Sequence, residues 1–362
     1  MKKLKLKFVK PPEDSFYKDL KKEVYADFTS RGLSIHANSQ MHFKTIFFFC
    51  LFISTYALII CFNLNPAMKL VLCFFHGIAI TGIGFNISHD CGHNAYFRKN
   101  KYNRLLSYSM DLVGSNSYMW DIKHNKSHHI YTNIDSFDED ITGSYLIRLS
   151  PHAPFHTLNR LQYIYAWLLY CMIYFYIIWV YNFFQFRANR FGPFVDIKHP
   201  VKEWVKLVGW KLFYLFYAIV FPIYWLQLSL IEFSIGYGVV CTTAGFLLGL
   251  TFYLAHCVEN CFEFPLPHKE KIEKSWARHQ METTSNFSME NKFITWFCGG
   301  LNYQIEHHLF PEICSIHYSK ISKIVKKVSK DHNIAYRYYS GLTPALKSHY
   351  KVLKKLSSSQ FN

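Results

Sequence analysis

The sequence predicts an all-α integral membrane protein with about four transmembrane helices in two hairpins, an additional in-plane helix and a cytoplasmic helical cap. Apolar residues form 51% of the 362 residues and gather in runs of about 20 residues, the length of a membrane-spanning helix. The formal net charge is +16, and the charged residues lie between and after these runs. A nucleic-acid-binding protein would explain the charge but not the apolar runs, whereas a membrane protein with basic cytoplasmic loops explains both.

Residues 1–43 precede every apolar run and are predicted to form a cytoplasmic N-terminal segment without a cleavable signal peptide. They are typical of an amphipathic helix, with Asp14 or Ser15 as its N-cap and Gly32 as its stop. Apolar runs at 45–63 and 68–87 follow, joined by a short turn that contains Pro66. Because the turn is short, the two runs are predicted to form a hairpin whose ends lie on one side of the membrane.

Three further apolar runs, 161–184, 205–226 and 230–255, separate two histidine-rich stretches. Three crossings would place those stretches on opposite sides of the membrane. The loop after the first of these runs is rich in Lys and Arg, which favours the cytoplasmic side. We therefore predict that 161–184 is in-plane or re-entrant and that 205–255 forms a second hairpin, although hydropathy alone makes 161–184 a full crossing. The membrane domain is expected to occupy 44–330, followed by a basic C-terminal tail at 331–362.

Histidines gather in three clusters near the ends of the predicted spans. An i, i+4 pair places two imidazoles on one face of a helix, so each cluster can offer at least two ligands to one metal ion. One such pair is expected by chance in a chain with 19 histidines, so the argument depends on all three clusters together. The clusters are His89-Asp-Cys-Gly-His93, His124-Asn-Lys-Ser-His128-His129 and Gln304-Ile-Glu-His307-His308, and His256 lies at the end of the last run.

These histidines predict a di-metal site in the cap. Imidazole-rich ligation suits iron, zinc or copper. Eight histidines are more ligands than one octahedral ion can take, but they fit two irons. Alternatives stay open for two residues: His256 could cap helix carbonyls, and Gln304 could ligate weakly or only hydrogen-bond a ligand. His76 is expected to be a buried structural histidine, and His279 to lie at the surface or beside the ligands. Asp138 and its acidic neighbours could accept the distal N–H of a ligating imidazole or form a solvated loop.

At these motifs the sequence resembles the membrane fatty acid desaturase family, in particular bacterial acyl-CoA or acyl-lipid desaturases similar to front-end and linoleoyl-CoA desaturases. The resemblance covers roughly residues 16–353, and the three clusters in this order are highly specific for it. Gln304, in place of a first His in the third cluster, links the chain to the front-end branch. The matching stretches are HDCGH (89–93), WDIKHNKSHHIYTNIDSFDED (120–140), WARHQMETTSNF (276–287) and NYQIEHHLFP (302–311).

The resemblance implies an oxygen-dependent enzyme that inserts a cis double bond into a lipid-linked or CoA-linked acyl chain. It implies dioxygen as co-substrate and a separate electron donor, such as a ferredoxin or a cytochrome with its reductase, because the sequence has no His-Pro-Gly-Gly haem motif. Phe252 stands where stearoyl-type relatives have an Asn ligand. The implied location is a bacterial inner membrane, with the metal site on the cytoplasmic face. The implied ligands of two irons are His89, His93, His124, His128, His129, His256, His307 and His308, with Gln304 as a further candidate.

Other functions fit part of the pattern. Relatives with similar clusters include lipid hydroxylases, epoxygenases and ketolases, so a di-iron enzyme of that kind is the main alternative. A histidine-rich metal transporter would need ionisable residues along its spans, where only His76 and Glu232 qualify. The Lys-rich C-terminal segment is expected to bind an anionic head group, a carrier or an acidic electron donor, or simply to be attracted to the membrane surface. Its lysines are Lys320, Lys323, Lys326, Lys327 and Lys330.

Overall fold

The computed structural model describes residues 2–4, 6–9, 11–142, 144–261 and 271–359, and these residues are mostly helical. Five helices are long and apolar enough to cross a membrane, and each overlaps one of the predicted apolar runs. This confirms a helical membrane protein. Within the described residues, β-structure is limited to strands of two residues each and an isolated bridge between Ser144 and Ile147. The five helices are Ser39–Cys61, Pro66–Gly92, Thr157–Arg187, Val201–Leu226 and Leu230–His256.

The first hairpin forms as predicted. Helix α2 (Ser39–Cys61) is capped by the side chain of Asn38, which accepts a hydrogen bond from the Met41 amide. Asn65 caps α3 (Pro66–Ile83) in the same way, and Pro66 occupies a first-turn position where its missing N–H costs nothing. The helix continues through a π-helical segment (Gly84–Ser88) into α4 (His89–Gly92). One continuous helix therefore carries the first histidine cluster out of the membrane region.

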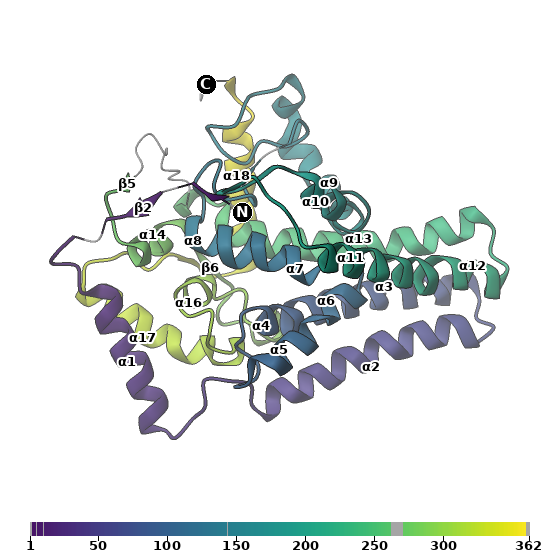
Figure 1. Cartoon of the computed structure of the whole chain (residues 1–362), viewed down its shortest axis with the longest axis horizontal. Coiled ribbons are helices and arrows are strands. Elements are labelled where there is room, and N and C mark those ends of the chain that lie inside the picture. Colours follow the sequence, from purple (N-terminus) through teal and green to yellow (C-terminus); the bar gives the residue numbers. More distant parts are fainter. Residues whose placement is uncertain (1, 5, 10, 143, 262–270, 360–362) are drawn as a thin grey trace.

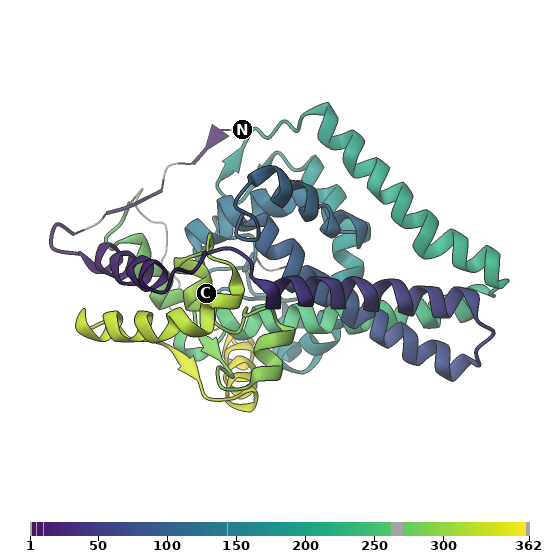
Figure 2. The ribbon, with the colours of Figure 1, turned by 90° about the horizontal axis from the view of Figure 1, so that it is seen from below.

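The second hairpin consists of α11 (Val201–Leu215), α12 (Phe221–Leu226) and α13 (Leu230–His256). Ser229 and Glu232 form a reciprocal capping box at the start of α13. Helix α13 packs closely on α3 at Gly77, where an added Cβ would lie only 2.9 Å from the Val240 carbonyl oxygen. The two hairpins run side by side and end together, at the right of Figure 1. There Trp225 Nε1 donates to the Ile60 carbonyl oxygen at 3.2 Å, and Figure 2 shows the α11–α12 helix approaching that end obliquely.

The helix 157–187 differs from the other four because both of its ends contact polar segments outside the hairpins. Near its start, in α9 (Gln162–Tyr176), Gln162 Nε2 donates to the Leu353 carbonyl oxygen at 3.2 Å. It ends in α10 (Asn182–Arg187), and soon afterwards the Gly192 amide donates to Glu139 at 2.6 Å. Its middle crosses α13 at Gly245, where an added Cβ would lie 2.6 Å from the Cys171 carbonyl oxygen.

The remaining helices form a polar cap at one end of the hairpins, at the left of Figure 1. Helix α1 (Phe16–Ser30) follows Ser15 and ends before Gly32, whose φ of +60° suits glycine, so the predicted N-terminal helix is confirmed. It packs on α17 (Tyr318–Asp331) through a buried apolar core. Helix α18 (Leu342–Leu356), within the predicted C-terminal tail, packs against α9 and α13. The predicted division at 44–330 stays a prediction. The cap also contains α14 (Trp276–Thr283) and α16 (Gln304–Leu309).

Candidate metal centre

The three histidine clusters converge where α13 and the helix of α3 and α4 enter the cap. The second cluster lies on a π-helical segment, η2 (Asp121–His128), followed by α8 (His129–Tyr131), rather than on the expected α-helix. The wider turn keeps His124 and His128 on one side, with ring centroids 5.3 Å apart and nearly parallel. π-helical turns are frequent at functional sites. The third cluster lies on α16, whose residues are all buried.

Four histidines from all three clusters form what we call the first histidine group. Their candidate ligand nitrogens all lie within 4.8 Å of one another. Nε2 of His89 lies 3.3 Å from Nε2 of His124. The indole of Trp120 stacks on the His124 ring at a centroid distance of 4.5 Å and meets the His93 ring edge-on at 5.3 Å. The group consists of His89, His93, His124 and His307.

A second histidine group consists of His128, His256 and His308, whose candidate ligand nitrogens also lie within 4.8 Å of one another. All three side chains are almost fully buried. The last residue of α13 therefore joins the second and third clusters, as predicted for His256. Phe252, one turn earlier on α13, packs on two of these imidazoles, with centroid distances of 5.3 Å to His128 and 5.0 Å to His256.

His129 lies between the two groups. Its Nε2 is 3.1 Å from Nε2 of His124 and 2.9 Å from Nε2 of His307. Its ring also stacks on that of His308 at 4.3 Å. Nitrogen separations of this size fit imidazoles on one ion, because ligands at about 2.1 Å and at right angles lie about 3 Å apart. All eight predicted histidines thus meet in one place, and that they bind metal remains a prediction.

Each imidazole of the second group has its distal nitrogen held by a defined partner. Nδ1 of His128 lies 3.0 Å from Asp138 Oδ2, and Nδ1 of His256 lies 3.2 Å from the Thr283 carbonyl oxygen. Nδ1 of His308 lies 2.8 Å from Gln280 Oε1. Such partners fix the tautomer and aim Nε2 toward the centre. Of the two interpretations of Asp138, the structure supports the one in which it accepts an imidazole N–H.

Several polar atoms at the centre that a metal could use have no hydrogen-bond partner among the described residues. Nε2 of His93, His128, His256 and His308 is buried without a hydrogen-bond partner among the described residues. The same holds for Oε1 of Gln304. Buried polar atoms are normally paired, so several orphaned lone pairs around one point fit a site for cations. The residues therefore fit the metal that the sequence predicts, and whether Gln304 ligates remains a prediction.

The electrostatics favour neutral imidazoles. Burial and the adjacent imidazoles hold the pKa values of His93, His124, His129, His307 and His308 well below the ordinary value. Neutral imidazole is the form that coordinates metals. His128 differs: burial opposes its protonated form, but the Asp138 and Asp140 carboxylates raise its pKa. An acidic partner at Nδ1 also makes the opposite nitrogen a stronger ligand.

Several residues that support the centre were not predicted from the sequence. Gln280 and Thr132 bond to each other at 2.8 Å, and both lie beside His308 Nδ1. The Tyr318 hydroxyl lies 3.2 Å from His307 Nδ1. His279, expected at the surface or beside the ligands, is buried with Nε2 2.7 Å from the Thr132 carbonyl oxygen. These residues come from three separate chain segments, so no local sequence signal could have identified them.

The predicted structural histidine and two cysteines near the centre can also be placed. His76 is buried in the first hairpin, where Nδ1 lies 2.9 Å from the Thr55 hydroxyl, as predicted for a structural histidine. Cys257 and Cys261 are buried, and neither belongs to a potential metal-binding group of the described residues.

Comparisons with known proteins agree with this site. The family model described as fatty acid desaturase matches residues 65–340. The chain is 35% identical to a sn-1 linoleoyl-lipid 6-desaturase of Synechocystis, over 95% of this chain and 96% of that protein. It is 34% identical to a protein of the same description from Arthrospira platensis, over 94% and 92%. It is 30% identical to an acyl-lipid (8-3)-desaturase of Physcomitrium patens, over 99% and 75%. The chain therefore belongs to the fatty acid desaturase family.

Proposed function

We propose that this desaturase inserts a cis double bond into an acyl chain of a membrane lipid, using two irons held by the eight histidines. The observation that carries the proposal is the convergence of the three clusters and His256, with unpartnered nitrogens directed at one place. Lipid-linked rather than CoA-linked substrates are supported by the names of the relatives, which are acyl-lipid desaturases. Those names also support a double bond near the carboxyl end, such as position 6.

The reaction must break an unactivated C–H bond, which no side-chain acid or base can attack. Bound iron would supply the oxidising chemistry with dioxygen. The chain's own residues fix the geometry: Asp138, Gln280 and the Thr283 carbonyl orient the second histidine group. The ring of Phe252 covers His128 and His256 and keeps water from them. Electrons would come from a separate donor protein.

An apolar cavity between the two hairpins suits the methyl end of an acyl chain. It has a volume of about 290 Å³ and is lined by α2, α3, α12 and α13, with Ile80 and Val240 among the lining residues. Ile80 precedes His89 by nine residues, about 14 Å along a helix. That distance is comparable with half of a long fatty acyl chain. Gly236, also in the lining, lies beside Cys73, and an added Cβ would meet the Cys73 Sγ at an ordinary contact distance of 3.5 Å.

The cavity can be tested by filling it. Gly236→Leu places a branched side chain in the cavity, and we expect the enzyme to favour shorter acyl chains. The matched control is Gly238→Leu, because an added Cβ there meets nothing within 4 Å. Product profiles from a host fed acids of several lengths provide the measurement. An unchanged length preference in Gly236→Leu would show that the chain ends elsewhere.

We propose the topology of two hairpins with helix 157–187 lying in or beside the membrane plane and the centre on the cytoplasmic face. The Nε2 atoms of His129 and His307 are 2.9 Å apart, so both residues lie on the same side of the membrane. The chain between them must therefore cross the membrane an even number of times. Only two of the three intervening helices can then be full crossings. The start of helix 157–187 and the loop that follows its end both contact the cap, which makes it the exception. Labelling of Arg190→Cys with an impermeant thiol reagent tests this, since labelling from the outside would contradict it.

The first test of the function is the fatty-acid profile of a host that expresses the chain and is fed linoleic acid. A new acid with one more double bond, absent with His128→Ala, supports desaturation and gives its position. Oxygenated acids instead would support the hydroxylase, epoxygenase or ketolase alternative. If the profile is unchanged, the iron content of the purified protein decides, because a protein without iron excludes the di-iron proposal.

A further inference from the structure

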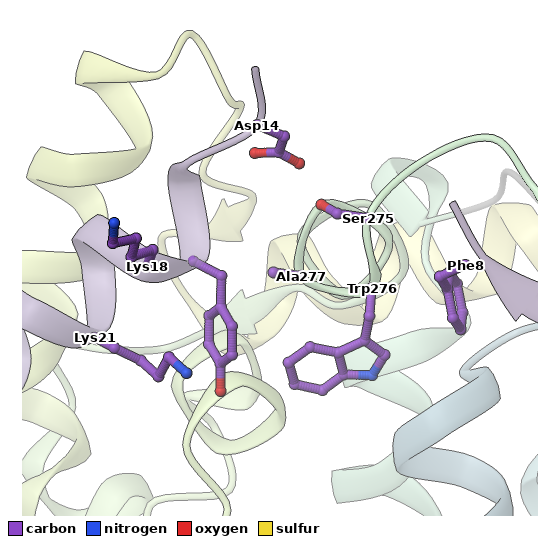
Figure 3. Close-up of a pocket in the computed structure, with 8 residues that line it drawn as sticks. Phe8, Asp14, Lys18, Lys21, Ser275, Trp276 and Ala277 are labelled. Carbon is purple, nitrogen blue, oxygen red and sulfur yellow. The ribbon is translucent and has the colours of Figure 1, made fainter. Parts of the chain in front are cut away.

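A second cavity lies on the cap, between α1 and α14 (Figure 3). It has a volume of about 340 Å³. Tyr17, Lys18 and Lys21 of α1 line one side, and Trp276 of α14 lines the other. The rings of Tyr17 and Trp276 meet edge-on with centroids 5.3 Å apart, so the two aromatic side chains that line the cavity are in contact with each other.

Both aromatic side chains are hydrogen-bonded to the backbone of the histidine clusters. Trp276 Nε1 donates to the carbonyl oxygen of His129 at 3.0 Å. The Tyr17 hydroxyl donates to the carbonyl oxygen of Leu309, the residue after His308, at 2.8 Å. Trp276 is only partly buried, so a short chain of covalent and hydrogen bonds joins the cap surface to the centre. Bonded paths of this kind couple electron donors to acceptors better than gaps of the same length.

The surroundings of the cavity are basic. Lys18 and Lys21 are exposed, and Lys21 Nζ lies 4.7 Å from the centroid of the Tyr17 ring. Two nearby carboxylates are already paired: Asp14 with Arg278 at 3.2 Å, and Asp19 with His332 at 3.2 Å. Helix α17 packs on α1 and adds exposed lysines to the cap. These are Lys320, Lys323, Lys326, Lys327 and Lys330.

The position of the cavity favours a soluble partner. Figure 1 shows α1 and α14 at the end of the molecule opposite to the far ends of the hairpins. If the hairpins span the bilayer, this surface faces the aqueous phase and not the lipid head groups. The lysines around the cavity then indicate an acidic partner protein, because opposite charges on two proteins guide their encounter and fix their relative orientation.

We propose that Lys18, Lys21 and the neighbouring α17 lysines dock a small acidic one-electron carrier protein, and that Trp276 couples it to the centre. This inference rests on the proposed desaturase function. The overall reaction is R–CH2–CH2–R′ + O2 + 2 e⁻ + 2 H⁺ → R–CH=CH–R′ + 2 H2O. The acyl chain supplies two of the four electrons that reduce dioxygen. The carrier supplies the others in two deliveries and is oxidised by one electron each time, and the two protons come from water.

The experiment compares two routes of reduction in the iron-loaded, purified enzyme. Reduced plant-type [2Fe–2S] ferredoxin is the protein donor, and dithionite is a small donor that needs no docking site. For Lys18→Glu/Lys21→Glu we expect the KM for ferredoxin to rise about tenfold at low salt, so that the ferredoxin-to-dithionite rate ratio falls. The control Lys347→Glu/Lys354→Glu reverses two exposed lysines on α18, away from the cavity, and should leave both rates unchanged.

Trp276→Phe separates coupling from docking. It keeps an aromatic ring but removes the N–H bonded to the His129 carbonyl, so the limiting ferredoxin-driven rate should fall several-fold while the KM for ferredoxin stays constant. Iron content and thermal unfolding verify that the variant is folded and loaded.

Three results would overturn the inference. The first is a wild-type enzyme that turns over with dithionite but not with ferredoxin. The second is a lysine variant with an unchanged KM for ferredoxin. The third is a lysine variant whose KM for the lipid substrate rises instead, which would make the cavity a head-group site. A wild-type enzyme that binds no iron and forms no product with either reductant would refute the proposed function itself, and is therefore distinguishable from all three.

Discussion

The two histidine groups are held in place by different means. In the second group each distal nitrogen has a partner: a carboxylate, a side-chain amide or a backbone carbonyl. In the first group His307 has the Tyr318 hydroxyl, whereas Nδ1 of His89 has no hydrogen-bond partner among the described residues. The imidazoles of this group are held mainly by packing rather than by hydrogen bonds, because the Trp120 indole contacts His89, His93 and His124.

This difference shows two ways to pre-organise a metal site. Hydrogen bonds to Nδ1 set both the tautomer and the direction of Nε2, so the second group is fixed by polar chemistry. Packing around an indole restricts ring rotation but leaves the tautomer free, so the first group is fixed mainly by shape. Polar substitutions should therefore damage the second group most, and changes of volume should damage the first.

Loss of a ligand should have the largest effect and should not distinguish the groups. We expect His308→Ala and His93→Ala each to abolish desaturation, because both ions are needed and each variant removes one strong ligand. The metal content of each variant should fall by about half, with the other group still occupied. Metal analysis and fatty-acid profiles provide the measurement. Full metal content in either variant would show that the replaced histidine is not a ligand.

Asp138→Asn tests the polar support of the second group. The amide cannot hold the Nδ1 proton of His128 as the carboxylate does, so we expect activity or metal affinity to fall about 10–100-fold. Asp135→Asn is the control, because Asp135 contacts the Ser136 hydroxyl and no histidine of the centre. If both variants behave alike, the acidic stretch acts only through its general charge.

Much of this centre could be predicted from the sequence, because a metal site repeats a few residue types at helical spacings. His89, His93, His128 and His308 could be identified that way. The supporting residues could not be, since Gln280 reaches His308 only after α14 packs against α16. The π-helical turns also leave no simple periodic signal. The membrane helices followed from hydropathy, but the path of helix 157–187 depends on contacts with distant segments, including Leu353.

Gly92→Ala tests the packing of the first group. An added Cβ would lie 2.1 Å from the Trp120 ring, so the indole must move away from the imidazoles that it contacts. Overpacking of this kind costs about 1–3 kcal/mol, and we expect lower thermal stability together with weaker metal binding. Gly84→Ala is the matched control on the same helix, because nothing lies within 4 Å of its added Cβ. Equal losses in the two variants would attribute the effect to the helix and not to Trp120.

The smallest expected effect comes from Tyr318→Phe, which removes the hydroxyl beside the His307 imidazole of the first group. Tyr318 is 1% exposed, so water cannot easily replace the hydroxyl beside His307 Nδ1. A lost neutral hydrogen bond is worth about 0.5–1.5 kcal/mol, so metal affinity should fall only a few-fold. Tyr339→Phe, which removes a hydroxyl bonded to Ser348, should change nothing at the centre. If Tyr318→Phe were as damaging as Asp138→Asn, the first group would also depend on polar support, and the contrast between the two groups would be wrong.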